Sequence, residues 1–256
     1  MNSGVHFVAS GEKFLAEAIE NAKYSRQFTG SLPISISTNL VQTAEFSRAF
    51  DFVINHPSPS FSYRDKIVAL LRLPYRQTLY LDSDAIVISP ITRLFQLLDH
   101  YDVAGVAAPV RHPPGWSDGL VPRSFTEINT GVLLLKRCRL QRRLISRWLR
   151  LYDKLLEDHN QSWDQASFRS VLWNFIQQKN LQFCHLPPEI NLRTPKPWIA
   201  GRGMDVNIIH GRFVRNELDA FVSYLNTSIN RFRTSDEWLR LNPSTSIRPM
   251  FDNPTS

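Results

Sequence analysis

The sequence predicts an α/β fold in which helices flank a mostly parallel central sheet. Short apolar runs typical of strands alternate with segments of helical periodicity over most of the 256 residues. The chain also opens with a strand–helix–strand unit, which is the building block of a parallel sheet. No internal repeat or linker long enough to separate two domains interrupts this alternation. We therefore expect one domain over residues 1–234 and a short helix with a tail over residues 235–256.

The opening unit begins with an apolar run at residues 5–9, and a segment with helical spacing of apolar residues follows. Residues 32–38 then alternate apolar and small polar residues, as a strand does. The loop after a first parallel strand lies at the carboxyl edge of the sheet, where α/β proteins bind ligands. The candidates for contact with a nucleotide base are Ala9, Ser10, Lys13 and Phe14. For Phe14 the alternative is packing on the core face of its helix.

The later elements follow from apolar runs, helical periodicity and turn residues. Strands are expected at residues 49–54, 78–88, 102–108, 127–135, 181–186 and 204–209. Helices are expected at residues 62–73, 91–98 and 139–156, from residue 162 onward, and at residues 215–230. Two prolines exclude regular structure from residues 56–60, whereas Pro90 suits the first turn of a helix. The long loop at residues 109–126 is typical of a lid or an acceptor-binding loop.

Two carboxylates follow an apolar, β-prone run within the stretch at residues 78–88. On an extended chain, side chains two residues apart point the same way, so Asp82 and Asp84 should project together where a buried strand reaches the surface. Like charges this close repel, and a divalent cation removes the repulsion. A cation with open positions can also bind the oxygens of a diphosphate. The pair therefore predicts the metal end of a nucleotide-sugar site.

The composition indicates a folded protein with acidic partners. Hydrophobic residues make up 43% of the chain and charged residues 21%, which argues against an intrinsically disordered chain. A net charge of +7 and a pI of about 9.6 favour nucleoside diphosphates, nucleic acid or anionic lipid as partners, without choosing among them. The two cysteines, Cys138 and Cys184, lack the spacing of a zinc site, so we expect reduced, packed thiols.

We expect a cytoplasmic location. The first residues lack the basic and long apolar regions of a signal peptide, and no window reaches the roughly 18 apolar residues of a membrane span. Peripheral membrane contact stays open, because residues 139–156 predict a basic amphipathic helix. The arginines that lie off its apolar stripe are Arg142, Arg143, Arg147 and Arg150. They indicate either an ordinary solvated face or a contact with an anionic membrane or an acidic acceptor.

Three pieces of sequence occur together in one order. They are Leu81-Asp82-Ser83-Asp84, then Ile128-Asn129-Thr130-Gly131-Val132, then Trp163-Asp164-Gln165 followed by Ile209-His210-Gly211. In this order and at this spacing they resemble the glycosyltransferases of family 8, the glycogenin-like and bacterial galactosyltransferase-like enzymes. The resemblance covers roughly residues 5–212 and implies a single domain with the Rossmann-like GT-A fold.

The resemblance also implies a metal and a donor site. Asp82 and Asp84 match the metal-binding motif of the family and His210 matches its third ligand, a set that suits Mn²⁺, or alternatively Mg²⁺. The residues expected to hold the nucleotide donor are Ala9, Ser10, Phe14, Lys66, Asp82, Ser83, Asp84, Gly211 and Arg212. Among them, Lys66 would reach the phosphates and Phe14 would contact a uracil ring.

The implied catalytic residues are Asn129, Asp164 and Gln165. Asn129 matches an asparagine beside the donor sugar, and the Asp164-Gln165 pair matches residues near the anomeric carbon. The implied reaction moves a sugar from a UDP-sugar to a saccharide, lipid or protein acceptor with retention of configuration. Nucleic acid is not among the implied partners.

One departure from the family concerns the phosphate ligand. The family often follows its histidine with Lys-Pro-Trp, whereas here His210 is followed by Gly211-Arg212-Phe213-Val214-Arg215. Either Arg212 or Arg215 could replace the missing lysine.

Three alternatives compete with this interpretation. A haloacid-dehalogenase-type phosphatase also has an apolar run before paired aspartates, but it needs threonine or valine where this chain has Ile86. A nucleotidyltransferase needs a glycine-rich loop, and residues 8–13 contain too little glycine. A non-catalytic nucleotide-sugar-binding or interaction domain is the third alternative, and it predicts no turnover.

Overall fold

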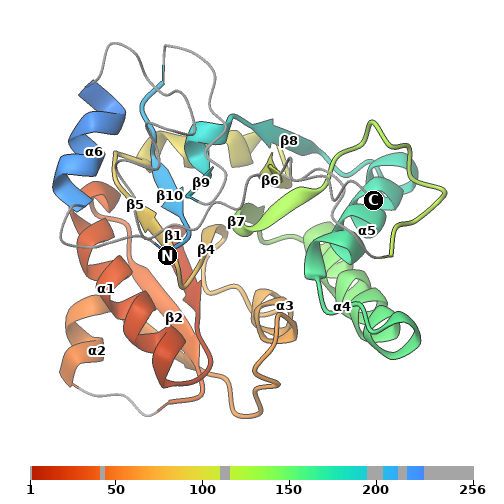
Figure 1. The fold of residues 1–256 in the computed structure, drawn as a ribbon, viewed down its shortest axis with the longest axis horizontal. Coiled ribbons are helices and arrows are strands. Elements are labelled where there is room, and N and C mark those ends of the chain that lie inside the picture. Colours follow the sequence, from red (N-terminus) through yellow and green to blue (C-terminus); the bar gives the residue numbers. More distant parts are fainter. Residues whose placement is uncertain (1, 41–43, 110–115, 195–203, 213–217, 228–256) are drawn as a thin grey trace, which may run out of the picture.

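The computed structural model describes residues 2–40, 44–109, 116–194, 204–212 and 218–227 (Figure 1). Three sequence predictions fall outside these described residues. They are the tail at residues 235–256, the role of Arg215, and the middle of the loop at residues 109–126.

A seven-stranded sheet with the order β3-β2-β1-β4-β7-β6-β8 forms the centre of the molecule. Its strands are β1 (Ser3–Val8), β2 (Ile34–Thr38), β3 (Phe52–Asn55), β4 (Gln77–Asp82), β6 (Val103–Ala107), β7 (Ile128–Lys136) and β8 (Phe183–Leu186). β7 runs antiparallel to both of its neighbours, and the other neighbouring pairs are parallel. The predicted mostly parallel sheet is confirmed.

Helices cover both faces of this sheet, as Figure 1 shows. The α-helices are α1 (Glu12–Thr29), α2 (Ala44–Ala49), α3 (Arg64–Leu70), α4 (Arg139–His159), α5 (Asp164–Lys179) and α6 (Leu218–Thr227), and the 3-10 helices are η1 (Thr92–Asp99) and η2 (Pro188–Ile190). One core cluster lies between the sheet and α1, α2 and η1, and a second lies between the sheet and α3, α4 and α5.

Alternation along β4 shows how the sequence builds these two cores. Leu79 and Leu81 belong to the cluster under α1, whereas Tyr80 belongs to the cluster under α3 to α5. The apolar stripe predicted for α4 also packs inward, and Trp148 is fully buried. No helix among the described residues combines the length and the apolar character needed to cross a membrane.

Several elements differ from the sequence prediction. The strand expected at residues 204–209 is confined to β10 (Ile208–His210), and the helix expected at residues 62–73 to α3. The helix expected at residues 91–98 is the 3-10 helix η1. Its buried side chains Phe95 and Leu98 are three residues apart, and three residues are one turn of a 3-10 helix. This geometry places both side chains over the sheet.

The stretch at residues 78–88 is not one extended chain. β4 ends at Asp82, Ser83 and Asp84 form a turn, and β5 (Ala85–Val87) joins a second sheet with the order β5-β10-β9, where β9 is Leu192–Arg193. The expectation that both aspartates project from one extended strand is therefore wrong. They converge because the chain turns between two sheets. α1 fixes this turn, since Asn21 donates to the carbonyl oxygen of Ser83 at 2.6 Å.

Candidate active site

A pocket of about 570 Å³ opens at the carboxyl edge of β1 and β4. Its lining comes from the loop between β1 and α1, the start of α3, the turn after β4, and the first residues of β7 and α5. Among the described residues, every sequence-predicted site residue except Gly211 lines this pocket. Gly211 lines a smaller adjoining cavity, and its backbone N–H donates to the carbonyl oxygen of Asp84 at 3.0 Å. The structure thus brings together side chains from Ala9 to Arg212, which are far apart in the sequence.

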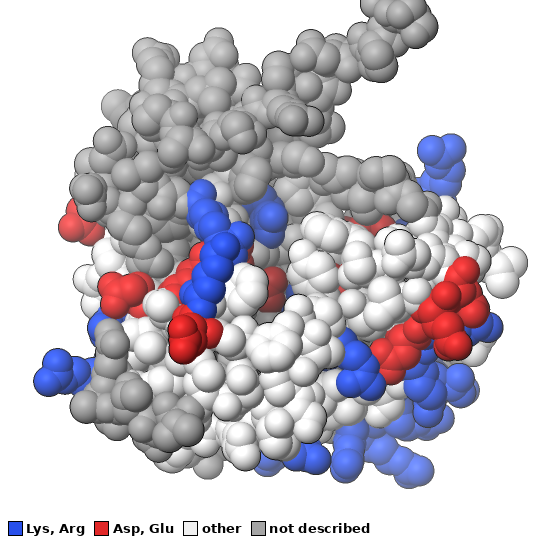
Figure 2. Space-filling view, turned by 60° about the horizontal axis from the view of Figure 1, so that its bottom comes forward, with Lys and Arg blue, Asp and Glu red and all other residues white. Residues whose placement is uncertain are grey.

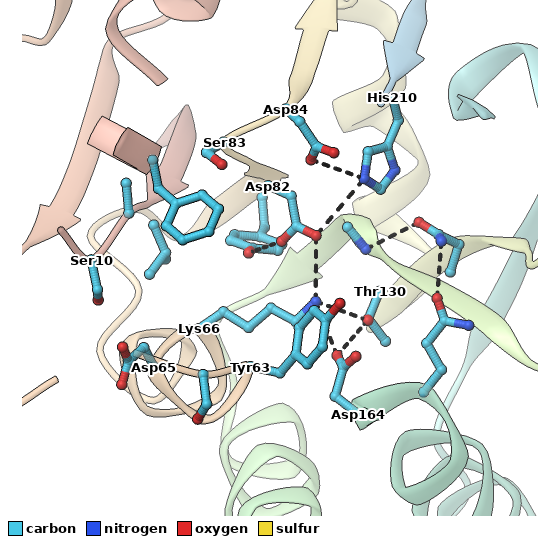
Figure 3. A pocket seen from close by; sticks show the side chains of 18 of the residues that line it. Ser10, Tyr63, Asp65, Lys66, Asp82, Ser83, Asp84, Thr130, Asp164 and His210 are labelled. Atoms are coloured by element: carbon cyan, nitrogen blue, oxygen red, sulfur yellow. Dashed lines mark hydrogen bonds and ion pairs between the residues drawn. The ribbon is translucent and has the colours of Figure 1, made fainter. Parts of the chain in front are cut away.

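Asp82, Asp84 and His210 form a compact group at the top of the pocket (Figure 3). Nε2 of His210 lies 3.3 Å from Oδ1 of Asp84 and 3.8 Å from Oδ2 of Asp82. Burial would raise the pKa of Asp84, but His210 and two nearby arginines lower it below its ordinary value. The Asp84 carboxylate can therefore present negative charge to a cation.

The surroundings of His210 suit a metal ligand. Its Nδ1 lies 2.9 Å from Oδ1 of Asn191, an acceptor that selects the tautomer with hydrogen on Nδ1 and leaves a lone pair on Nε2. Gly131 leaves the necessary space, because a Cβ there would lie 2.0 Å from Cε1 of His210 and 2.7 Å from Oδ2 of Asp82. The donor set of two carboxylates and one imidazole fits Mn²⁺ or Mg²⁺.

Arg193 also reaches His210. Its Nη1 lies 2.8 Å from Nε2 of His210, the nitrogen that faces the two aspartates. A guanidinium cannot accept a hydrogen bond, so this nitrogen of His210 is the acceptor. A cation bound to Nε2 would displace the Arg193 guanidinium, which lines the same pocket.

Lys66 is buried beneath the group formed by Asp82, Asp84 and His210, which we call the candidate metal group. Its Nζ lies 2.9 Å from Oδ2 of Asp164 and 3.5 Å from Oδ2 of Asp82, and it donates to Oγ1 of Thr130 at 3.1 Å. Burial would lower the pKa of Lys66, but the two carboxylates raise it above its ordinary value, so the ammonium stays charged. Thr130 also donates to Oδ2 of Asp164 at 2.6 Å. The Asp164 carboxylate is therefore held in one orientation.

A chain of hydrogen bonds runs from His210 of the candidate metal group to Asn129 and Gln165, two of the predicted catalytic residues. His210 donates to Asn191, Asn191 donates to Oδ1 of Asn129 at 2.9 Å, and Asn129 donates to Oε1 of Gln165 at 2.9 Å. Gln165 in turn donates to Oε2 of Glu127 at 3.3 Å. Burial raises the pKa of Glu127 to about 7. Each side chain in this series donates to the next one, so the orientation of each amide group is fixed.

The other end of the pocket carries exposed aromatic rings. Phe14 is 41% exposed, so packing on the core face of α1, the alternative for this residue, is wrong. The guanidinium of Arg212 lies 5.9 Å from the centre of the Phe14 ring, and its Nε lies 2.9 Å from Oε1 of Glu17. Phe61 is 66% exposed, with a positive φ of 53° that is rare for a bulky residue.

Sequence reasoning missed several members of this site. Those that lie in or directly behind the pocket are Tyr80, Glu127, Thr130, Asn191 and Arg193. Thr130 stands inside a motif that was recognised, and Tyr80 stands two residues before Asp82, to which its hydroxyl donates. Asn191 and Arg193 follow a proline turn without any periodic or motif signal, so only the fold reveals them.

Comparisons with known proteins agree with this geometry at the level of the fold. No family model and no curated protein matches the sequence. The structure is similar to the glycosyltransferase GlyE from Streptococcus pneumoniae TIGR4, with a TM-score of 0.57 and 19% identity over 94% of this chain. It is also similar to an active-site mutant of LgtC, with a TM-score of 0.57 and 15% identity over 96% of this chain.

A further similar structure is mouse xyloside xylosyltransferase 1, with a TM-score of 0.52 and 15% identity over 83% of this chain. The chain has the GT-A fold. The match spans 98% of LgtC but 60% of GlyE. The fold expected from the family resemblance is thus confirmed.

Proposed function

We propose that this chain is a metal-dependent glycosyltransferase that uses a nucleoside-diphosphate sugar, specifically a UDP-sugar, as donor. The observation that carries the proposal is the convergence of Asp82, Asp84 and His210 in the main pocket of a GT-A fold. These three residues would hold Mn²⁺ or Mg²⁺. When bound, the cation supplies positive charge that stabilises the departing diphosphate.

The chain's own residues would position the donor around this group. The exposed ring of Phe14 offers a stacking face for the uracil, and Arg212 beside it carries positive charge toward the diphosphate. Arg193, released from His210, would add a second guanidinium able to bind phosphate oxygens. This pair would take the place of the lysine that is missing after His210.

In the transfer step, the bond between the anomeric carbon and the diphosphate oxygen breaks. The acceptor hydroxyl oxygen forms the new bond to that carbon, and its proton passes to the departing diphosphate oxygen. Asp164 is held by Lys66 and Thr130, so we assign it to orientation and charge stabilisation together with Asn129 and Gln165. Attack on the same face would retain the configuration, as the resemblance implies.

A saccharide is the acceptor class that the pocket favours over a lipid or a protein. Tyr63 and Trp163 line the pocket, are 40% and 37% exposed, and have ring centres 5.6 Å apart. Their apolar faces and polar edges suit a sugar ring, which is itself apolar on its face and polar at its rim.

The proposal is tested by calorimetry with UDP in the presence and absence of Mn²⁺. We expect wild-type protein to bind UDP more tightly with Mn²⁺, and Asp84→Asn to lose this metal-dependent gain because one anionic ligand is gone. Asp158→Asn removes an exposed carboxylate of α4 outside the pocket and should bind like wild type. Equal UDP affinity with and without metal in the wild type would refute the metal role.

Turnover separates the enzyme from the non-catalytic alternative. A screen of nucleotide sugars with Mn²⁺ should reveal slow donor hydrolysis, which needs no acceptor. Binding of UDP without hydrolysis of any donor would instead favour a nucleotide-sugar-binding domain. The GT-A fold argues against the phosphatase alternative.

A further inference from the structure

The outer side of α4 carries a row of arginines without acidic partners. Arg139, Arg142, Arg143, Arg147 and Arg150 recur three or four residues apart, so they share one side of the helix, opposite the buried stripe. All five are exposed. Within the part of the chain that the structure describes, none of them forms an ion pair.

The row continues past the beginning of α4. The backbone N–H of Arg137 donates to the carbonyl oxygen of Arg76 at 2.7 Å, and its Nη1 donates to the carbonyl oxygen of Leu73 at 3.3 Å. Arg72 precedes Leu73, so these residues adjoin the start of α4. We call the following eight exposed residues the arginine face: Arg72, Arg76, Arg137, Arg139, Arg142, Arg143, Arg147 and Arg150.

The arginine face accounts for the basic character of the whole chain. The net charge is +7, so without these eight residues the chain would have no positive excess. In Figure 2, lysine and arginine side chains gather along the lower right of the molecule, beside an acidic patch. Positive charge is thus gathered in one region of the face that Figure 2 shows.

Helix stability does not explain this arrangement. Like charges three or four residues apart destabilise a helix, and positive charge in the first turn opposes the helix dipole. The first turn of α4 contains no acidic residue that would compensate. By contrast, Asp153 further along the helix is paired with Arg64, with Oδ1 and Nε 2.8 Å apart. An external anionic partner would compensate the charge of the arginine face.

We propose that the arginine face binds an anionic membrane surface. None of its residues lines either of the two cavities described above. A plane of lipid phosphates matches charges spread along a helix, and guanidinium groups bind phosphate in pairs of hydrogen bonds. The large aromatic side chains of α4, Trp148 and Tyr152, are buried, so neither ring is available for nucleic-acid bases to stack on beside the arginines.

Vesicle flotation with the full chain tests the proposal. We expect binding to phosphatidylcholine vesicles that contain phosphatidylserine, release at high salt, and no binding to phosphatidylcholine alone. Each arginine near such a surface strengthens binding about fivefold. Replacing three of them, with Arg142→Gln, Arg143→Gln and Arg147→Gln together, should therefore weaken binding on the order of 100-fold.

A matched control removes the same charge elsewhere. Arg48→Gln, Arg93→Gln and Lys179→Gln together change three exposed residues outside the arginine face and should retain most of the binding. Circular dichroism melting checks that both triple variants are folded, and a folded Arg→Lys triple variant at 142, 143 and 147 should still bind. Equal loss in both glutamine variants, binding to uncharged vesicles, or binding to DNA in place of vesicles would each overturn the proposal.

Discussion

Gly131 shows how one missing side chain shapes the candidate metal site. The residue lies in β7, and a Cβ on it would lie 2.0 Å from Cε1 of His210 and 2.7 Å from Oδ2 of Asp82. Real Cβ atoms do not approach other atoms this closely, so two ligands from different sheets can meet only across a glycine. The sequence motif includes this glycine, but the requirement for glycine at this position comes from its tertiary contacts with His210 and Asp82.

We therefore expect Gly131→Ala to lower the affinity for Mn²⁺ by about 10- to 100-fold, because the methyl group must push His210 or Asp82 aside. Isothermal calorimetry with Mn²⁺ measures this loss. The matched control is Gly4→Ala, whose Cβ would lie 2.5 Å from the Tyr75 ring at the opposite end of the sheet. It should cost about 1–3 kcal/mol of stability but leave Mn²⁺ affinity unchanged below the melting temperature. Equal Mn²⁺ affinity in both variants would contradict this reading of Gly131.

At the scale of the element, β1 contains a fully buried histidine. Nδ1 of His6 lies 2.8 Å from Oγ of Ser35, and Nε2 lies 3.0 Å from Oγ of Ser37, both in the neighbouring strand β2. Burial lowers the pKa of His6 from 6.5 to about 3. The ring is therefore neutral in the folded protein, where it ties two strands together beside the site.

This pKa predicts that the fold loses stability in acid. Below pH 6.5 the unfolded chain binds a proton at His6 that the folded chain does not bind until about pH 3. The contribution is present in full above pH 6.5 and falls with pH by up to about 1.4 kcal/mol per unit. Urea unfolding at pH 7 and pH 5 should show a loss larger by about 2 kcal/mol in the wild type than in His6→Gln. The same loss in both proteins would exclude His6 as its source.

At the scale of the whole molecule, a line of amides joins the two sheets and α5. It runs from His210 in β10 through Asn191 and Asn129 to Gln165 at the start of α5, and it ends on Glu127. One set of hydrogen bonds thus orients His210 of the candidate metal group and the predicted catalytic residues Asn129 and Gln165. No motif in the sequence indicates that Asn191 belongs to it.

Two substitutions of Asn191 should separate its two contacts. Asn191→Leu removes the acceptor for Nδ1 of His210, so Mn²⁺ affinity should fall by about 10- to 100-fold. Asn191→Asp keeps that acceptor but cannot donate to Asn129, so it should bind Mn²⁺ well while donor hydrolysis slows. Calorimetry and the hydrolysis assay measure the two effects. Wild-type metal affinity in both variants would show that Asn191 does not position His210.

From the sequence alone we predicted the α/β class, the mostly parallel sheet, most strands and helices though not α2, and the three residues proposed as metal ligands. Periodicity and turn residues carry the structural information locally. The resemblance depends on the order of the motifs around Asp82, Asn129, Asp164 and His210. The sequence did not determine element ends, the 3-10 form of η1, or the turn between the two sheets. Those depend on packing against distant segments.

The other side chains of the site are brought together by tertiary contacts. Asn191 and Arg193 meet His210 because β9 pairs with β10, and Glu127 meets Gln165 because α5 begins beside β7. These contacts join residues far apart along the chain, and no local pattern records them. The tertiary structure also decided that two aspartates converge through a turn, where the second sheet brings His210 to them, rather than along one strand.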